Sequence, residues 1–148
     1  MHCQMPEQSR RLVLLVDDCR DSNATWAILL RMWGFEVELA GDGETAVRAA
    51  RLKMPAAVLL DIGLPGADGY EVARHIRALH GPRPLLIALT GRSQPLDLIA
   101  ANEVDFDLHL IKPADPDRIR TILETYCNGL KAQAKDEGSL SPMAAVAS

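Results

Sequence analysis

Five short apolar segments, separated by helix-like stretches, constrain the fold more than any other feature of the chain. They are LVLLV (12–16), FEVEL (35–39), AAVLL (56–60), LLIAL (85–89) and DLHLI (107–111). Each has the length of a strand, each of the first four is followed by a stretch with helical features, and the fifth leads into a closing helix. Strands that alternate with helices are typical of a parallel α/β sheet, so we predict five strand–helix units.

The composition of the segments predicts which strands lie inside the sheet. Segments 12–16, 56–60 and 85–89 are continuously apolar, as expected of strands covered by helices on both faces. Segment 35–39 alternates apolar and acidic residues, which is typical of an edge strand with one face in water. We therefore predict a doubly wound parallel sheet of the flavodoxin-like class. In the order of that fold, 2-1-3-4-5, strands one and three are neighbours where the order reverses.

Capping residues mark the ends of several predicted helices. The first helix, around residues 22–33, is expected to stop at Gly34 in the left-handed conformation. The third is predicted to begin after Pro65-Gly66, where Asp68 and Glu71 have the spacing of a capping box. These signals are local, so they predict where each helix begins or ends and not how it packs.

The later helices and the chain ends complete the expected organisation. The fourth helix, at residues 94–103, has the weakest pattern, while the last has Asp115 as N-cap, Pro116 at its first position and its end at Asn128-Gly129. We expect an N-terminal extension (1–10), one domain (11–128) and a disordered tail (129–148) that lacks periodicity. Met1 and this tail favour a protein that stands alone.

The overall composition limits the classes of partner. The chain has 148 residues, of which 48% are hydrophobic, and a net charge of −4, which disfavours nucleic-acid binding. No apolar run approaches the ~20 residues of a membrane span. The three cysteines contain no CxxC pair, so neither a disulfide framework nor a zinc site is indicated. We expect a cytoplasmic protein that binds proteins or small ligands.

Three carboxylates are predicted to meet at the carboxyl edge of the sheet. Asp17 and Asp18 end the first strand and Asp61 ends the third. Two carboxylates at ~4 Å repel by roughly 4 kcal/mol at an effective dielectric of 20, so the cluster calls for a cation. Oxygen ligands in an open site favour Mg²⁺. Alternatively, Asp17 or Asp18 caps the following helix, but capping does not account for Asp61.

Two further strand ends supply a hydroxyl and an ammonium. Strand four ends at Thr90, followed by Gly91, and strand five ends at Lys112, followed by Pro113. Phosphoryl transfer depends on positioning and on neutralising spread negative charge. A carboxylate nucleophile, Mg²⁺, a hydroxyl and a lysine together predict a site that binds and receives a phosphoryl group.

The motifs that carry these residues resemble the receiver (phosphoacceptor) domain of two-component response regulators. They are VDD (16–18), LLDIGLPGADGYE (59–71), ALTG (88–91) and HLIKP (109–113). The resemblance extends from about Arg11 to Asn128, and segment 59–71 looks most like receivers of hybrid sensor kinases. It implies that Asp61 is the phosphorylated nucleophile.

The resemblance also implies roles for the neighbouring groups. Asp18 and Asp61 would bind Mg²⁺ directly with the backbone carbonyl of Gly63, and Asp17 would bind it through water. Thr90 and Lys112 would each hold a phosphoryl oxygen, and the Lys112–Pro113 bond is often cis in such domains.

A switch is implied as well. In the family, phosphorylation draws the threonine at the position of Thr90 inward, and an aromatic residue at the position of His109 follows, reshaping the face made by helix four, strand five and helix five. Histidine could make this switch sensitive to pH, or it could serve only as a packing aromatic. A sensor histidine kinase or a histidine phosphotransfer protein would supply the phosphoryl group.

Two other functions are weighed against this one. Haloacid-dehalogenase-type phosphatases share the aspartate, Mg²⁺, hydroxyl and lysine, but they need an acid two residues after the nucleophile, where this chain has Gly63. A phosphate-independent interaction module would usually have lost one of the five site residues. We therefore expect a single-domain response regulator and not a turnover enzyme on an external substrate.

Overall fold

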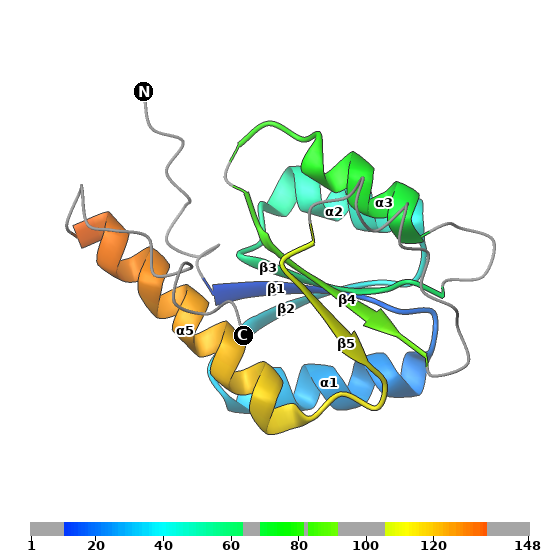
Figure 1. The fold of residues 1–148 in the computed structure, drawn as a ribbon, viewed down its shortest axis with the longest axis horizontal. Helices are drawn as coiled ribbons and strands as arrows, with labels where there is room; N and C mark the ends of the chain where they lie inside the picture. The colour runs from blue at the N-terminus through cyan, green and yellow to red at the C-terminus, as the bar shows by residue number, and fades with distance from the viewer. Residues whose placement is uncertain (1–10, 64–68, 82, 92–105, 136–148) are drawn as a thin grey trace.

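The computed structural model describes residues 11–63, 69–81, 83–91 and 106–135 (Figure 1). Five parallel strands form one sheet in the order β2-β1-β3-β4-β5. The strands are β1 (Leu12–Val16), β2 (Glu36–Ala40), β3 (Ala57–Asp61), β4 (Leu85–Thr90) and β5 (Leu108–Ile111). The described helices are α1 (Arg20–Met32), α2 (Gly43–Lys53), α3 (Gly69–Arg77) and α5 (Pro116–Lys135). The predicted parallel α/β fold and its strand order are confirmed.

Helices cover both faces of the sheet, as the continuous apolar strands require. Figure 1 shows α1 and α5 on one face, and α2 and α3 on the other. Leu30 of α1 and Leu123 of α5 join one apolar cluster with Leu15 and Leu59 of the sheet. Alternate strand residues such as Leu14 and Leu60 join a second cluster with α2 and α3. Successive strand residues point to opposite faces, so each central strand contributes to two cores.

Burial separates the central strands from the edge. All five residues of β3 are buried, and so are Val13–Val16 of β1. At the edge, Glu36 of β2 is exposed and Leu39 is 42% exposed. The prediction that segment 35–39 forms an edge strand is confirmed, although the strand begins one residue later, after the buried Phe35.

The helix boundaries agree with the sequence where capping groups act. Gly34 follows α1 with φ +92°, and α5 begins at Pro116 with the Asp117 N–H donating to Asp115 Oδ1 over 3.0 Å. However, α1 begins at Arg20, two residues before the predicted start. The capping box at Asp68 lies outside the described residues, as do the predicted helix at 94–103 and the N-terminal extension.

The predicted end of the last helix at Asn128-Gly129 is wrong, because α5 continues to Lys135. Glycine inside a helix costs about 1 kcal/mol relative to alanine, so it favours an end without enforcing one. Here Gly129 is buried and is followed by LKAQAK, whose residues are all good helix formers. The expected tail therefore does not begin at residue 129, and residues 136–148 lie outside the described part.

None of the helices described is long and apolar enough to cross a membrane.

Candidate functional site

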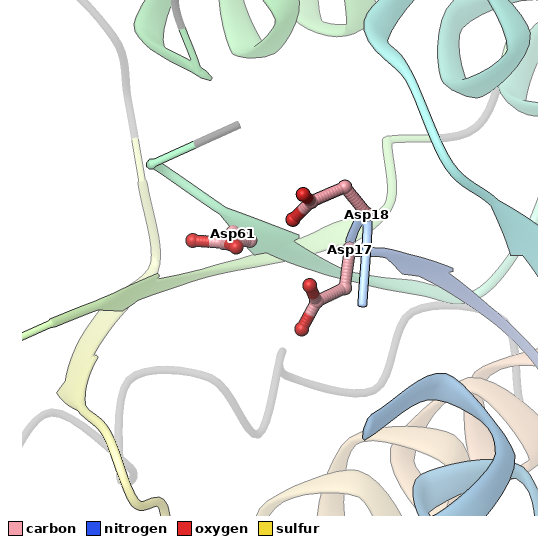
Figure 2. Close-up of side chains that lie close together, drawn as sticks. All are labelled: Asp17, Asp18 and Asp61. Carbon is pink, nitrogen blue, oxygen red and sulfur yellow. The ribbon is translucent and has the colours of Figure 1, made fainter. Parts of the chain in front are cut away.

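The three predicted carboxylates do converge beyond the ends of β1 and β3. One oxygen from each of Asp17, Asp18 and Asp61 lies within 4.8 Å of the other two, and Figure 2 shows the side chains gathered at these strand ends. Asp17 is 7% exposed and Asp61 6% exposed, whereas Asp18 faces solvent. The strand order brings them together, because β1 and β3 are paired through Val16 and Leu60, the residues just before Asp17 and Asp61.

Backbone groups hold Asp17 in place. Its Oδ1 accepts a hydrogen bond from the Cys19 N–H at 3.0 Å, and its own N–H donates to Ala40 O at 3.1 Å. Its carbonyl accepts a 2.7 Å hydrogen bond from Nδ2 of the buried Asn23. Asp17 therefore shapes the turn before α1 and its Oδ2 faces Lys112. The capping alternative is wrong, because the N-cap of α1 is Cys19 and no side chain caps this helix.

Asp61 is fixed in a similar way. Its Oδ1 accepts a hydrogen bond from the Gly63 N–H at 2.9 Å. The next residue, Ile62, donates its N–H to Leu89 O of β4 at 3.0 Å, which anchors the end of β3. Gly63 thus lies beside Asp61, while its predicted role as a carbonyl ligand of Mg²⁺ stays a prediction.

Lys112 provides the cation that faces the cluster. Its Nζ lies 3.0 Å from Asp61 Oδ2 and 3.5 Å from Asp17 Oδ2. Partial burial lowers the pKa of Lys112, but the hydrogen bond and charge of Asp61, with a further contribution from Asp17, outweigh it and raise the pKa overall. The Lys112–Pro113 bond is cis, as predicted. The single ammonium neutralises only part of the charge of the three carboxylates, so the cluster keeps a negative charge that a further cation can neutralise.

Thr90 and His109 lie on the same face of the sheet. The register pairs Ala88 with His109 and Thr90 with Ile111, and the Lys112 N–H donates to Thr90 O at 2.7 Å. Leu89 and Leu110 point into the cluster beneath α1 and α5, so their neighbours Thr90 and His109 point to the opposite face. The predicted switch residues are therefore diagonal neighbours on adjacent strands.

His109 packs against an aromatic neighbour. Its ring centroid lies 4.9 Å from that of Phe106, with an interplanar angle of 61°. Phe106 in turn meets the buried Tyr70 of α3 edge to face, with 6.1 Å between the centroids. His109 remains exposed, but partial desolvation lowers its pKa below the ordinary value of 6.5. This contact favours the packing role among the two that the sequence left open.

The donor set fits a hard divalent cation. Mg²⁺ is commonly held by one or two carboxylates and several waters, and the cluster offers three carboxylates on an open edge, one of them exposed. Asp18 and Asp61 can contribute direct oxygen ligands, with Asp17 close enough to hold a bound water. Among the described residues, no other group of three or more acidic, histidine or cysteine side chains has this geometry.

Asn23 is the site residue that the sequence analysis missed. It sits in the first turns of α1 and is one of three polar or charged residues that are buried in the described chain, the other two being Asp17 and Asp61. The sequence does offer one signal for Asn23: it is a polar residue, six positions after Asp17, on a helix that is expected to pack against the sheet. Cys19, by contrast, is an exposed free thiol that contributes only its backbone N–H.

Comparison with known proteins identifies relatives of this fold and site. The transcriptional regulatory protein CreB of Escherichia coli strain K12 is 36% identical over 118 residues, which cover 77% of this chain and 51% of CreB. The transcriptional regulatory protein PrrA of Mycobacterium tuberculosis strain H37Rv is 41% identical over 101 residues, covering 68% of this chain and 43% of PrrA. The chain thus spans about half the length of these curated relatives.

A solved structure and a family model agree with these relatives. The receiver domain of sensor histidine kinase PA1611 from Pseudomonas aeruginosa PAO1, with a magnesium ion coordinated in its active site cleft, matches with a TM-score of 0.71. It is 32% identical and the match covers 80% of this chain and 98% of that one. The model of the response regulator receiver domain matches residues 13–124. This chain therefore belongs to the response regulator receiver domain family.

Proposed function

We propose that this chain is a response regulator that accepts a phosphoryl group on Asp61, in a reaction that depends on Mg²⁺. The observation that carries the proposal is the charge arrangement at the sheet edge. The nearly buried Asp61 carboxylate lies within 4.8 Å of two further carboxylates and 3.0 Å from the Lys112 ammonium. Family membership supports the phosphoacceptor role, and the local geometry supports Asp61 as the acceptor.

The proposed reaction is a single displacement at phosphorus. A carboxylate oxygen of Asp61 attacks the phosphorus atom, a new P–O bond forms, and the bond from phosphorus to the donor breaks. The donor is phosphohistidine of a kinase or of a phosphotransfer protein, and its imidazole takes the electron pair of the broken P–N bond. Asp61 becomes an acyl phosphate, so the protein is the acceptor and not a catalyst that turns over an external substrate.

Side chains of this chain position and neutralise the transferred group. Lys112 lies beside Asp61 Oδ2, where its ammonium can pair with a phosphoryl oxygen. Thr90 ends the adjacent strand β4, and its hydroxyl can donate to another phosphoryl oxygen. Asp17, Asp18 and Asp61 would hold Mg²⁺, which when bound neutralises charge on the phosphoryl oxygens.

The switch is proposed to act through Thr90 and His109. These residues share one face of the sheet, and the ring of His109 already packs on Phe106. Movement of Thr90 toward a phosphoryl group would open space that His109 could enter, which biases a surface between two states. The downstream partner would bind a surface that includes β5 and α5.

Intact-mass analysis tests the acceptor function directly. The chain is incubated with Mg²⁺ and acetyl phosphate, a small phosphodonor, and the expected result is the added mass of one phosphoryl group. This addition should disappear with EDTA and in Asp61→Asn. A matched control is Asp117→Asn, which removes an exposed carboxylate in the first turn of α5 and should be labelled like the wild type.

Other outcomes would separate the alternative functions. Labelling that persists in Asp61→Asn would place the acceptor elsewhere and overturn the proposal. Absence of labelling both with acetyl phosphate and with a panel of phosphorylated histidine kinases would indicate a phosphate-independent interaction module. Continuous release of phosphate from phosphate monoesters would indicate a phosphatase, although Gly63 leaves no acid two residues after Asp61.

A further inference from the structure

Gly69, the first residue of α3, lies directly against the backbone that follows Asp61. It belongs to the motif LLDIGLPGADGYE (59–71) and is buried. A Cβ atom at this position would lie 2.6 Å from Ile62 Cα and 2.8 Å from Ile62 O. Carbon atoms in non-bonded contact normally lie about 3.5 to 4.0 Å apart. Any side chain at residue 69 would therefore have to push α3 and Ile62 apart by about 1 Å.

The position of α3 is fixed by its packing on the sheet. Four of its residues are buried in the apolar cluster on this face: Tyr70, Val72, Ala73 and Ile76. The helix also lies beside α2 (Figure 1). Protein interiors are close-packed, so moving α3 outward by 1 Å would weaken all of these contacts together. A side chain at residue 69 would therefore displace the Ile62 backbone more readily than it would displace the helix.

Ile62 joins two groups that shape the acceptor site. It follows Asp61 directly, and its N–H donates to Leu89 O at 3.0 Å. The next residue, Gly63, donates its N–H to Asp61 Oδ1 at 2.9 Å. A displaced Ile62 would therefore change the hydrogen bond that orients the Asp61 carboxylate. Binding sites must hold their groups within about 0.5 Å of the productive geometry, so a displacement of 1 Å is large.

Gly41 lies near the same edge of the sheet but lacks such a contact. It follows β2, and its neighbour Ala40 accepts the Asp17 N–H with its carbonyl oxygen. A Cβ atom at Gly41 would have no neighbour within 4 Å. Neither Gly41 nor Gly69 has a positive φ, so alanine can adopt the backbone conformation of both. The pair therefore allows the same substitution with and without a contact.

We propose that Gly69 is a positioning residue of the acceptor site, an inference that rests on the proposed function of Asp61. Because residue 69 has no side chain, α3 begins in contact with the Ile62 backbone and holds the Gly63 N–H on the Asp61 carboxylate. Gly63 also carries the carbonyl predicted to bind Mg²⁺, so the same contact sets the affinity for the metal. Gly69 acts only through Ile62 and Gly63.

Amide hydrogen exchange of the ¹⁵N-labelled full chain tests the positioning role without Mg²⁺. In the wild type, the Gly63 amide should exchange more slowly than an amide of an unfolded chain, because it donates to Asp61. In Gly69→Ala this amide should exchange faster, and the chemical shifts of Ile62 and Gly63 should change. Gly41→Ala should match the wild type in both respects. An unprotected Gly63 amide in the wild type, or an unchanged one in Gly69→Ala, would overturn the proposal.

Titration with Mg²⁺, followed by the same amide shifts, tests the effect on the metal. The dissociation constant should rise about tenfold in Gly69→Ala, the usual size of the effect when a residue that orients metal ligands is changed. It should stay near the wild-type value in Gly41→Ala. Alanine favours a helix more than glycine does, so weaker binding by a folded variant would not come from a less stable α3. Equal affinity in Gly69→Ala and the wild type would refute the role of Gly69.

A second variant keeps the proposal testable if circular dichroism shows that Gly69→Ala does not fold. Tyr70→Leu loosens the first turn of α3 without adding an atom near Ile62, because it removes the edge-to-face contact with Phe106. It should also speed exchange of the Gly63 amide, and no change there would overturn the proposal. A wild type that acetyl phosphate and phosphorylated kinases do not label would refute the phosphoacceptor function alone, since exchange of Gly63 is measured without Mg²⁺ or a phosphodonor.

Discussion

Replacing Asp18 by asparagine is expected to stabilise the folded chain when Mg²⁺ is absent. Asp18 is the exposed member of the carboxylate cluster, whereas Asp17 and Asp61 both accept backbone hydrogen bonds. Asparagine has nearly the same shape but no charge, so the substitution removes repulsion without opening a cavity. The same substitution should weaken Mg²⁺ binding and phosphorylation, because it removes a proposed metal ligand.

The magnitude follows from the separation of the charges. The carboxylate oxygens lie within 4.8 Å of one another, and two unit charges at that distance repel by about 1 kcal/mol in water and by about 3 kcal/mol at an effective dielectric of 20. Asp18 faces solvent, so the value for water applies to its repulsion with Asp17 and to its repulsion with Asp61. Salt screens part of this repulsion. We expect the free energy of unfolding to rise by about 1 to 2 kcal/mol at low ionic strength.

Urea unfolding with and without Mg²⁺ measures this effect. Without Mg²⁺ the variant should unfold at a higher urea concentration than the wild type, with an unchanged slope. Saturating Mg²⁺ should stabilise the wild type more than the variant, since an ion that binds only the folded state raises stability. Asp21→Asn is the control, since it removes an exposed carboxylate in the first turn of α1 and should cost about 0.5 kcal/mol through the helix dipole. A variant that is no more stable than the wild type without Mg²⁺ would refute the reasoning.

Four further results are expected. Lys112→Met should lower the initial rate of phosphorylation by acetyl phosphate about a hundredfold, measured by intact mass, because the ammonium beside Asp61 is lost. Asn23→Ala should lower the free energy of unfolding in urea by about 1 to 3 kcal/mol, because the Asp17 carbonyl loses its buried donor. Burial raises the pKa of Cys127 from 9.0 to about 11, so between these pH values the folded chain binds more protons than the unfolded chain. The free energy of unfolding should therefore fall by about 2 kcal/mol as pH rises through this interval, and it should fall less steeply in Cys127→Ala. Partial desolvation lowers the pKa of His109 below 6.5. The contribution of the neutral ring to stability should therefore be lost as pH falls from 6.5 toward the pKa of the folded chain. A His109 pKa of 6.5 or higher, measured by NMR titration of the imidazole, would contradict this.

The parallel α/β sheet and the central site residues could be predicted from short-range signals, whereas the strand order was taken from the flavodoxin-like fold. Apolar runs such as 12–16 and 56–60 require cover on both faces, which only a parallel sheet with helices on either side provides. Once β1 and β3 are neighbours, Asp17 and Asp61 must lie together at their carboxyl ends. The sequence therefore predicts both the fold and the convergence of charges.

The features that could not be predicted depend on packing between distant elements. Nothing in the spacing shows that Lys112 reaches Asp17 as well as Asp61, or that Asn23 donates to the Asp17 carbonyl. The end of α5 was placed at Gly129 because helix propensity is only a weak preference, and the sequence after it restores the helix.

The repulsion within the site is tolerated because the fold, and not the site itself, fixes Asp17 and Asp61. Val13–Val16 and Ala57–Leu60 are almost fully buried, so the strands that end at Asp17 and Asp61 are held by both apolar cores. Backbone N–H groups of Cys19 and Gly63 then orient the two carboxylates. Carboxylates that cannot move apart keep a high affinity for a cation, because binding relieves repulsion without further ordering of the chain. The buried central strands thus preorganise the proposed acceptor site. Mutations that loosen the cores should weaken the proposed Mg²⁺ binding even where they touch none of the three carboxylates.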